Sequence, residues 1–134
     1  MLSVWITGAS SGIGEACAYR YAEEGARLVL TSSSVNRLEP VAARCRELGA
    51  TEVNILPCDL TCLDGIDTLT DKAWDAMKGI DIVMLNAGIS QRTNVEDTSM
   101  EMVRKIMEIN YFAPVAIAKR LLPKMVGRGY GKIA

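Results

Sequence analysis

Short apolar runs alternate with longer segments of helical spacing along the chain. The apolar runs are rich in β-branched residues and predict strands at residues 2–7, 27–31, 52–56, 80–85 and 131–134. The segments between them predict helices at residues 12–24, 34–48, 62–77 and 99–126. Pro40 lies inside the second of these helices, where we expect a kink or a late start of the helix.

This alternation of strands and helices predicts an α/β fold. Successive strand-helix units form a parallel sheet, and right-handed crossovers place helices on both of its faces. The run at residues 80–85 is almost wholly apolar, which is typical of a central strand buried on both sides. We therefore predict one dinucleotide-binding domain over residues 1–134, a doubly wound (Rossmann-like) parallel sheet. Its ligand site is expected at the carboxyl ends of the strands.

Composition narrows the classes of partner. The 134 residues are 49% hydrophobic and 23% charged, which is the balance of a single globular domain. The formal net charge is −1 and no basic run occurs, so we expect no nucleic-acid partner. No apolar run approaches the ~18 residues that a membrane span needs, and the first residues lack a basic segment. We therefore expect a cytoplasmic protein with no membrane partner.

Histidine and cysteine content limits the possible chemistry. The chain has no histidine, which excludes Ser-His-Asp hydrolysis and histidine-ligated metals within it. Only two of its four cysteines, Cys58 and Cys62, are close in sequence, and they are not spaced as a Cys-x-x-Cys pair. We interpret the cysteines as free thiols and expect no metal site.

A glycine-rich turn follows the first predicted strand. Residues 7–14 read Thr-Gly-Ala-Ser-Ser-Gly-Ile-Gly, and a helix follows. Glycines let the backbone turn tightly and approach a phosphate, which the free N–H groups of a helix N-terminus also attract. The alternative is a plain strand-helix turn, but three glycines at this spacing favour a dinucleotide site. The predicted site residues here are Gly8, Ser10, Ser11, Gly12, Ile13 and Gly14.

Two further polar turns follow the third and fourth strands. The carboxylate of Asp59, which Leu60 follows, can accept a hydrogen bond from an adenine amino group, although Asp59 could instead cap a helix. Asn86, Ala87 and Gly88 follow the fourth strand, where small residues let the backbone approach a ribose; an ordinary turn is the alternative. We include these five residues in the predicted cofactor site.

In the order and spacing of these motifs the chain resembles the classical short-chain dehydrogenase/reductase family. The glycine turn matches the family's Thr-Gly-x-x-x-Gly-x-Gly, and Asp59 matches its adenine-binding aspartate. Residues 86–88 match the family's Asn-Asn-Ala-Gly, with Leu85 in place of the first asparagine. The resemblance implies an NAD(P)-dependent oxidoreductase that interconverts a carbonyl and an alcohol by hydride transfer.

The resemblance also implies that Asn110, in the long helix, is a catalytic residue. In the family, the backbone carbonyl of the matching asparagine holds a water of the proton relay to a lysine. Pro114 lies four residues after Asn110 and has no N–H to bond that carbonyl. The position of Pro114 and the role implied by the family thus both indicate the backbone carbonyl oxygen of Asn110. A simple packing kink in the helix is the alternative.

The end of the second strand bears on the choice between NADP and NAD. An acidic residue at this point favours NAD, whereas residues 32–34 are all serine. We therefore expect Ser32 and Ser33 to contact the cofactor and NADP to be preferred over NAD. Ser11 stands where many NADP-preferring relatives carry a basic residue. Arg37 could reach the cofactor or be a solvated surface charge, and we expect the second.

The family's catalytic Ser and Tyr-x-x-x-Lys do not occur in these residues. Tyr130 is no substitute, because Ala134 stands where the lysine would be. We interpret the chain as the cofactor-binding half of a longer enzyme, inactive alone, with its fourth strand bordering only a stub. A natural half-length protein, and a non-catalytic nucleotide-binding module or sensor, are the alternatives.

The partners follow from the same resemblance. It implies a small-molecule carbonyl or alcohol substrate, and residues 89–92 resemble reductases with lipid-like or steroid-like substrates. The long helix carries apolar residues at helical spacing, which fit a core or a partner's helix. These are Met102, Val103, Ile106 and Ile109. In the family this helix commonly packs between subunits, so we expect a homodimer or homotetramer.

Overall fold

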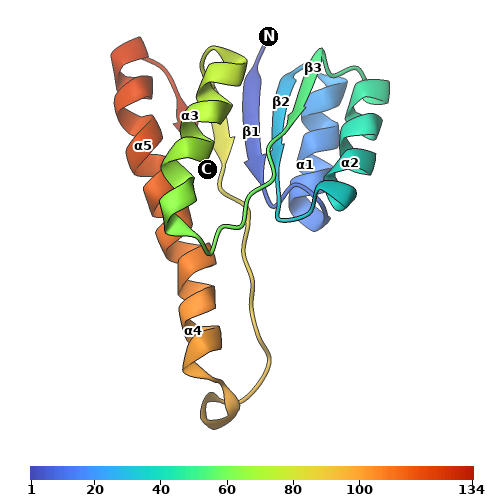
Figure 1. Ribbon diagram of the computed structural model, residues 1–134. Coiled ribbons are helices and arrows are strands. Elements are labelled where there is room, and N and C mark those ends of the chain that lie inside the picture. Colours follow the sequence, from blue (N-terminus) through green and yellow to red (C-terminus); the bar gives the residue numbers. More distant parts are fainter.

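Five parallel strands form one sheet in the order β3-β2-β1-β4-β5 in the computed structural model, which describes all 134 residues (Figure 1). The strands are β1 Ser3–Thr7, β2 Arg27–Thr31, β3 Glu52–Ile55, β4 Ile82–Met84 and β5 Lys132–Ile133. The chain runs outward from β1 to β3 and then returns to the other side of β1. This reversal is the topological switch point of a doubly wound sheet, and the predicted fold is confirmed.

Helices cover both faces of the sheet. They are α1 Gly12–Glu23, α2 Val35–Leu48, α3 Ile66–Met77, α4 Met100–Met107 and α5 Ala113–Arg128. In Figure 1 the pair α1 and α2 lies on one side of the strands, and α3 and α5 lie on the other. Short 3₁₀ turns occupy Leu63–Gly65 and Val95–Asp97. No helix combines the length and the hydrophobicity that crossing a membrane requires.

The sheet separates two apolar cores. Strand β1 is buried along its whole length, and its side chains alternate between the two faces. Val4 and Ile6 pack with residues of α1 and α2, whereas Trp5 packs with residues of α3 and α5. The indole Nε1 of Trp5 donates a hydrogen bond to Thr31 Oγ1 at 2.9 Å, and both residues are fully buried.

The fourth strand is shorter than predicted and has a neighbour on both sides. It pairs with β1 and, through Ile82 and Val83, with β5. The Leu85 N–H donates to Ala134 O at 2.7 Å, and the Ala134 N–H donates to Val83 O at 2.9 Å. The fourth strand therefore borders a two-residue strand, the stub that we expected, and the edges of the sheet are β3 and β5.

The predicted long helix is interrupted by one wider turn. A π-helical segment, Glu108–Phe112, joins α4 to α5, and the Ala113 N–H donates to Glu108 O, five residues back. Pro114 follows this segment directly, and a residue without an N–H is a common cause of such an interruption. In contrast, α2 begins at Val35 and continues through Pro40, so the late start considered for that helix is wrong.

Candidate functional site

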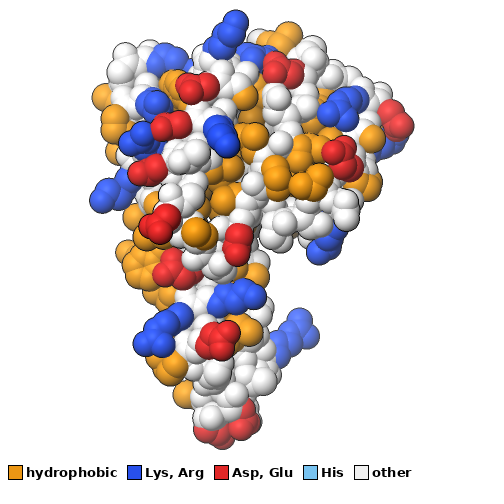
Figure 2. All heavy atoms as spheres, in the orientation of Figure 1, with side chains coloured by type: hydrophobic (Ala, Val, Ile, Leu, Met, Phe, Trp, Pro, Cys, Tyr) orange, Lys and Arg blue, Asp and Glu red, His pale blue; other side chains and the backbone are white.

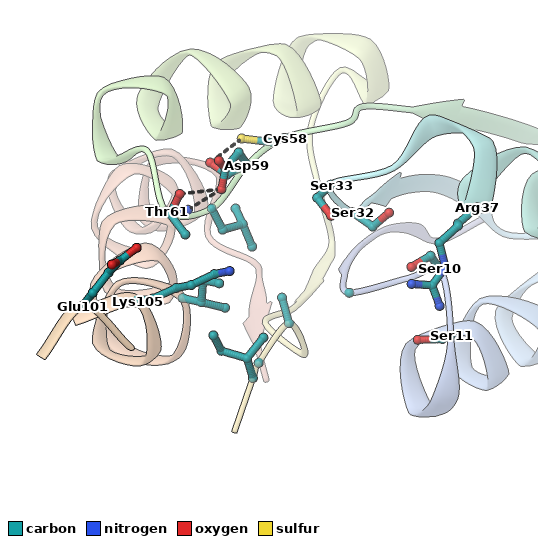
Figure 3. Close-up of a pocket in the computed structure, with 16 residues that line it drawn as sticks. Ser10, Ser11, Ser32, Ser33, Arg37, Cys58, Asp59, Thr61, Glu101 and Lys105 are labelled. Atoms are coloured by element: carbon teal, nitrogen blue, oxygen red, sulfur yellow. Dashed lines mark hydrogen bonds between the residues drawn. The ribbon is translucent and has the colours of Figure 1, made fainter. Parts of the chain in front are cut away.

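A cavity of about 680 Å³ lies at the carboxyl ends of the strands, at the switch point (Figure 3). Its walls come from the turns after β1 to β4, from the first turn of α2, and from α4 with the π-helical segment that follows it. The lining residues are Gly8, Ser10, Ser11, Ser32, Ser33, Arg37, Cys58, Asp59, Leu60, Thr61, Ala87, Gly88, Ile89, Glu101, Lys105 and Ile109. Nine of these are among the predicted site residues, so the fold brings most of that set together.

The three glycines of the first turn are required for different reasons. A Cβ on Gly8 would lie 2.8 Å from Ala87 Cα, so the turn passes directly against the segment after β4. Gly12 has φ +55° in open space, where glycine is favoured by conformation alone. A Cβ on Gly14 would collide with Gly8 O, because the first turn of α1 packs against the glycine turn. Gly12, Gly14 and the exposed Ile13 do not line the cavity.

Asn86 supports the glycine turn from the neighbouring strand. Its Nδ2 donates to Thr7 O at 3.2 Å and to Gly8 O at 3.3 Å. The Ala87 N–H donates to Thr7 Oγ1 at 3.1 Å, which joins the same two segments. Ala87 and Gly88 line the cavity, but the Asn86 side chain does not. The structure thus gives the Asn86 side chain a supporting position behind the turn, and the predicted approach of this backbone segment to a ribose stays a prediction.

Asp59 is held by a local turn. Its Oδ1 accepts from the Thr61 N–H at 2.9 Å and from Thr61 Oγ1 at 2.6 Å. These hydrogen bonds hold the pKa of the Asp59 carboxyl below its usual range, so it is ionised at neutral pH. The N-cap of α3 is Gly65, so the alternative in which Asp59 caps that helix is wrong. Its second oxygen, Oδ2, has no hydrogen bond and is available to a donor in the cavity.

Asn110 lies in the π-helical segment, behind the cavity wall. Its Nδ2 donates to Ile89 O at 2.7 Å, and its Oδ1 accepts from the Ile89 N–H at 2.8 Å. A Cβ on Gly88 would lie 3.4 Å from Asn110 Oδ1, so this contact is close. Ile89 lines the cavity, whereas Asn110 does not. The role predicted for the Asn110 backbone carbonyl stays a prediction.

Seven residues line the cavity beyond the predicted set. One is Arg37, which is exposed, and both interpretations of its charge stay open. The additional lining residues are Cys58, Thr61, Ile89, Glu101, Lys105 and Ile109. Burial raises the pKa of the Cys58 thiol, and all four cysteines are free. The interval of four between Glu101, Lys105 and Ile109 puts them on one helix face, a signal present in the sequence.

Comparison with known sequences identifies relatives over almost the whole chain. The short chain dehydrogenase family model matches residues 3–134. Dehydrogenase/reductase SDR family member 7 of Homo sapiens is 42% identical over 133 residues, with 97% of this chain and 39% of the relative covered. A hydroxysteroid 11-beta-dehydrogenase 1-like protein of Danio rerio is 34% identical, with 91% of this chain and 42% of the relative covered. The chain spans about two-fifths of the length of these relatives.

Solved structures of other proteins superimpose closely on this chain. A metagenomic short-chain oxidoreductase in complex with NADP gives a TM-score of 0.93 at 28% identity, covering 98% of this chain and 60% of that one. A short-chain dehydrogenase from Sphingobium yanoikuyae in complex with NADPH gives a TM-score of 0.89 at 34% identity, covering 99% of this chain and 52% of that one. Sequence, fold and the motif residues at the switch point agree, and the chain belongs to the short chain dehydrogenase family.

Proposed function

We propose that this chain is the cofactor-binding half of an NADP(H)-dependent oxidoreductase that interconverts a carbonyl and an alcohol. The observation that carries the proposal is the cavity at the switch point, bounded by the glycine turn and by the ionised Asp59. The structures of the metagenomic and Sphingobium relatives, named as NADP and NADPH complexes, support the same cofactor.

The residues present fit a dinucleotide. The cavity volume of about 680 Å³ is within the usual range of a small-molecule site. A side chain at Gly14 would collide with Gly8 O, so the backbone of the turn comes close to the first turn of α1. The N–H groups there would hold the pyrophosphate. Asp59 Oδ2 would accept the adenine amino group, and Ser32 and Ser33 would lie beside the adenosine ribose.

The bound cofactor would supply the hydride, and this chain's residues would bind and orient it. Asn86 would keep the glycine turn in place, and Asn110 would keep Ile89 in the cavity wall. The Ser and Tyr-x-x-x-Lys implied by the family do not occur in these 134 residues. We therefore propose that the chain binds the cofactor but does not complete the reaction by itself.

Calorimetric titration of the purified chain with NADPH tests this proposal. We expect saturable binding of one NADPH per chain and no oxidation of NADPH by a panel of ketones and aldehydes. Gly14→Asp should abolish binding, because a carboxylate would be forced against the glycine turn. Gly127→Asp, at an open position in α5, is the matched control and should bind normally. A folded wild-type chain that binds neither NADPH nor NADH would refute the proposal.

We also propose that the chain associates with a second copy through α4 and α5. Large apolar side chains are exposed along one face of these helices, and Figure 2 shows hydrophobic atoms gathered along the corresponding edge. They are Val103, Met107, Tyr111, Val115, Leu122 and Val126. Exposed apolar side chains in a contiguous row are typical of an interaction surface. Sedimentation equilibrium should give a dimer or tetramer mass that Tyr111→Lys with Leu122→Lys reduces to the monomer.

A further inference from the structure

We propose that Cys58 and Cys62 form a thiol modification site, at which a low-molecular-weight disulfide converts them into an intrachain disulfide across the Asp59 turn. The oxidised chain binds the cofactor more weakly, because the new bond moves Asp59. Both cysteines are free thiols in the structure. The inference rests on the proposed function, since the affinity concerned is that of the switch-point cavity, and it adds a chemical control of that affinity.

The two thiols lie at the ends of one tight turn after β3. The Cys62 N–H donates to Asp59 O at 3.2 Å, which closes a β-turn. The Cys58 thiol donates to the same oxygen at 3.6 Å. The Cys58 sulfur and the Cys62 nitrogen are therefore no further apart than these two distances together. Figure 3 shows Cys58, Asp59 and Thr61 gathered on one wall of the cavity.

The electrostatics of the turn agree with this proximity. Burial first, and then the charges of Asp59 and Cys62, raise the pKa of the Cys58 thiol. A charge on one thiol acts on the other only at short range. The two thiols differ in access, because Cys62 is exposed whereas Cys58 is half-buried in the cavity wall. A reagent in solution therefore reaches Cys62 first.

The other two cysteines are separate from this pair. Cys45 is fully buried, and burial is the main cause that raises its pKa to about 11. Cys17 and Cys45 belong to the core beside α1 and α2, whereas Cys58 packs against the core on the other face of the sheet. No three His, Cys, Asp or Glu side chains of the chain are grouped so that they could hold a metal ion. Exposure and proximity thus coincide at Cys58 and Cys62.

The exchange needs only a disulfide as oxidant, and glutathione disulfide serves as the probe. Cys62 loses its proton and its thiolate attacks one sulfur of the probe; that S–S bond breaks, and one glutathione leaves and takes up a proton. Cys58 then loses its proton and attacks the Cys62 sulfur, which releases the second glutathione. The two cysteines lose two electrons and two protons, and one glutathione disulfide becomes two glutathione thiols. In the mixed disulfide Cys62 carries no charge, so one cause of the raised Cys58 pKa disappears.

Closing the bond would disturb the part of the cavity assigned to adenine. A disulfide usually holds its two Cα atoms within about 7 Å. The β-turn brings the Cα atoms of Asp59 and Cys62 to that range, but Cys58 is one residue further out, so the segment must tighten. The Cys58 N–H is fixed to Ser32 O at 3.0 Å, so residues 59–62 take up the movement. These residues carry Asp59 Oδ2 and the Thr61 hydrogen bonds that orient it.

The test is a titration with glutathione redox buffers, in which free thiols are alkylated in denaturant and counted by mass. The reduced chain should take up four alkyl groups and the oxidised chain two fewer, with the loss in the peptide that contains Cys58 and Cys62. We expect NADPH to bind the oxidised chain roughly tenfold to hundredfold more weakly, the equivalent of one hydrogen bond to a charged group. By linkage, saturating NADPH should make the disulfide harder to form by the same factor.

Cys62→Ser is the informative variant, because Cys62 does not line the cavity. It should bind NADPH with the wild-type affinity and lose the response to glutathione disulfide. Cys17→Ala is the matched control and should keep the whole response. Far-ultraviolet circular dichroism establishes that each form is folded, and Cys62→Ala provides the comparison if Cys62→Ser is not.

The results separate distinct failures. A chain that keeps four thiols, stops at a mixed disulfide with the mass of one glutathione, joins other cysteines, or binds NADPH equally well when oxidised would overturn the inference. All of these leave the NADPH site standing. A reduced chain that binds neither NADPH nor NADH would remove the proposed function, and the control of affinity with it.

Discussion

The side-chain amide of Asn110 holds the backbone of Ile89 from both sides, with one hydrogen bond of 2.7 Å to its carbonyl and one of 2.8 Å from its N–H. The two residues are 21 positions apart in the sequence. An amide side chain mimics a neighbouring strand here, because it offers a donor and an acceptor at the spacing of a peptide group. The contact fixes the segment after β4 against the helical segment between α4 and α5.

This contact predicts a loss of stability in Asn110→Ala. Two hydrogen bonds would disappear, each worth about 1 kcal/mol, and water could partly replace them because the groups are exposed. We expect the free energy of unfolding in urea to fall by about 1 kcal/mol. Asn94→Ala is the control, since the Asn94 side chain is exposed and forms no hydrogen bond. Equal stability of both variants would show that the Asn110 amide contributes nothing.

The close approach at Gly14 predicts opposite signs for two glycine-to-alanine changes. In Gly14→Ala the added methyl group collides with Gly8 O, and we expect a loss of about 1–3 kcal/mol in the free energy of unfolding. In Gly127→Ala the methyl group enters open space in a helix, and alanine should add about 0.5–1 kcal/mol. Chemical unfolding of both variants measures this, and a stabilised Gly14→Ala would contradict the packing described.

The buried hydrogen bond between Trp5 and Thr31 predicts a penalty for Thr31→Val. Valine keeps the shape of threonine but leaves the indole N–H without an acceptor in the core. We expect a loss of about 1–3 kcal/mol, the usual cost of an unsatisfied buried donor. A double-mutant cycle with Trp5→Phe separates this contribution from the cavity that the smaller ring creates. A coupling energy near zero would count against the bond.

The turn at Asp59 predicts a change in acid stability for Thr61→Val. Hydrogen bonds from Thr61 lower the pKa of the Asp59 carboxyl in the folded state. The ionised group therefore stabilises the fold above its unfolded pKa of about 3.9, and this contribution is lost as the pH falls through the folded pKa. Removing the Thr61 hydroxyl should raise the folded pKa toward its ordinary value and reduce that acid-dependent loss.

A carbon-detected NMR titration of the Asp59 carboxyl measures the shift directly. Thermal unfolding from about pH 2 to about pH 6 measures its effect on stability. Thr68→Val, an exposed position in α3 without a side-chain hydrogen bond, is the control and should leave the titration unchanged. An unaltered Asp59 midpoint in Thr61→Val would mean that the hydroxyl does not hold the carboxylate.

Much of the fold was predictable because its signals are local. The strand-helix alternation and the apolar fourth run predict the parallel sheet without knowledge of any contact. The extent of β4 was not predictable, because Ile80 and Leu85 are as apolar as a strand interior and only the pairing with β1 decides where the strand ends. The π-helical segment also escaped prediction, since hydrophobic spacing does not distinguish it from a kink at Pro114.

The parts of the candidate site in which a motif fixes the backbone conformation were predictable. The parts in which a side chain reaches the site from a different helix or strand were not. The glycine turn and Asp59 follow strand ends, so the topology alone brings them to one edge of the sheet. That Arg37 lines the cavity was not predictable, because sequence spacing indicates which helix face a residue occupies but not what lies opposite that face. The supporting position of Asn86 depends on two strands that are about 80 residues apart, which no local pattern records.

Inward-facing side chains keep the same direction along α4, the π-helical segment and α5. Side chains directed at the cavity and then at the core follow one another at intervals of four: Glu101, Lys105, Ile109, Ala113, Ile117, Leu121 and Met125. Four residues of a straight α-helix rotate by about 400°, so such a row would drift by about 40° at each step. The wider turn at Glu108–Phe112 takes back part of this drift. The number of residues in the π-helical segment thus determines how α4 is rotated relative to α5. Deleting one residue would rotate α4 by about 100° against α5 and turn Lys105 away from the cavity.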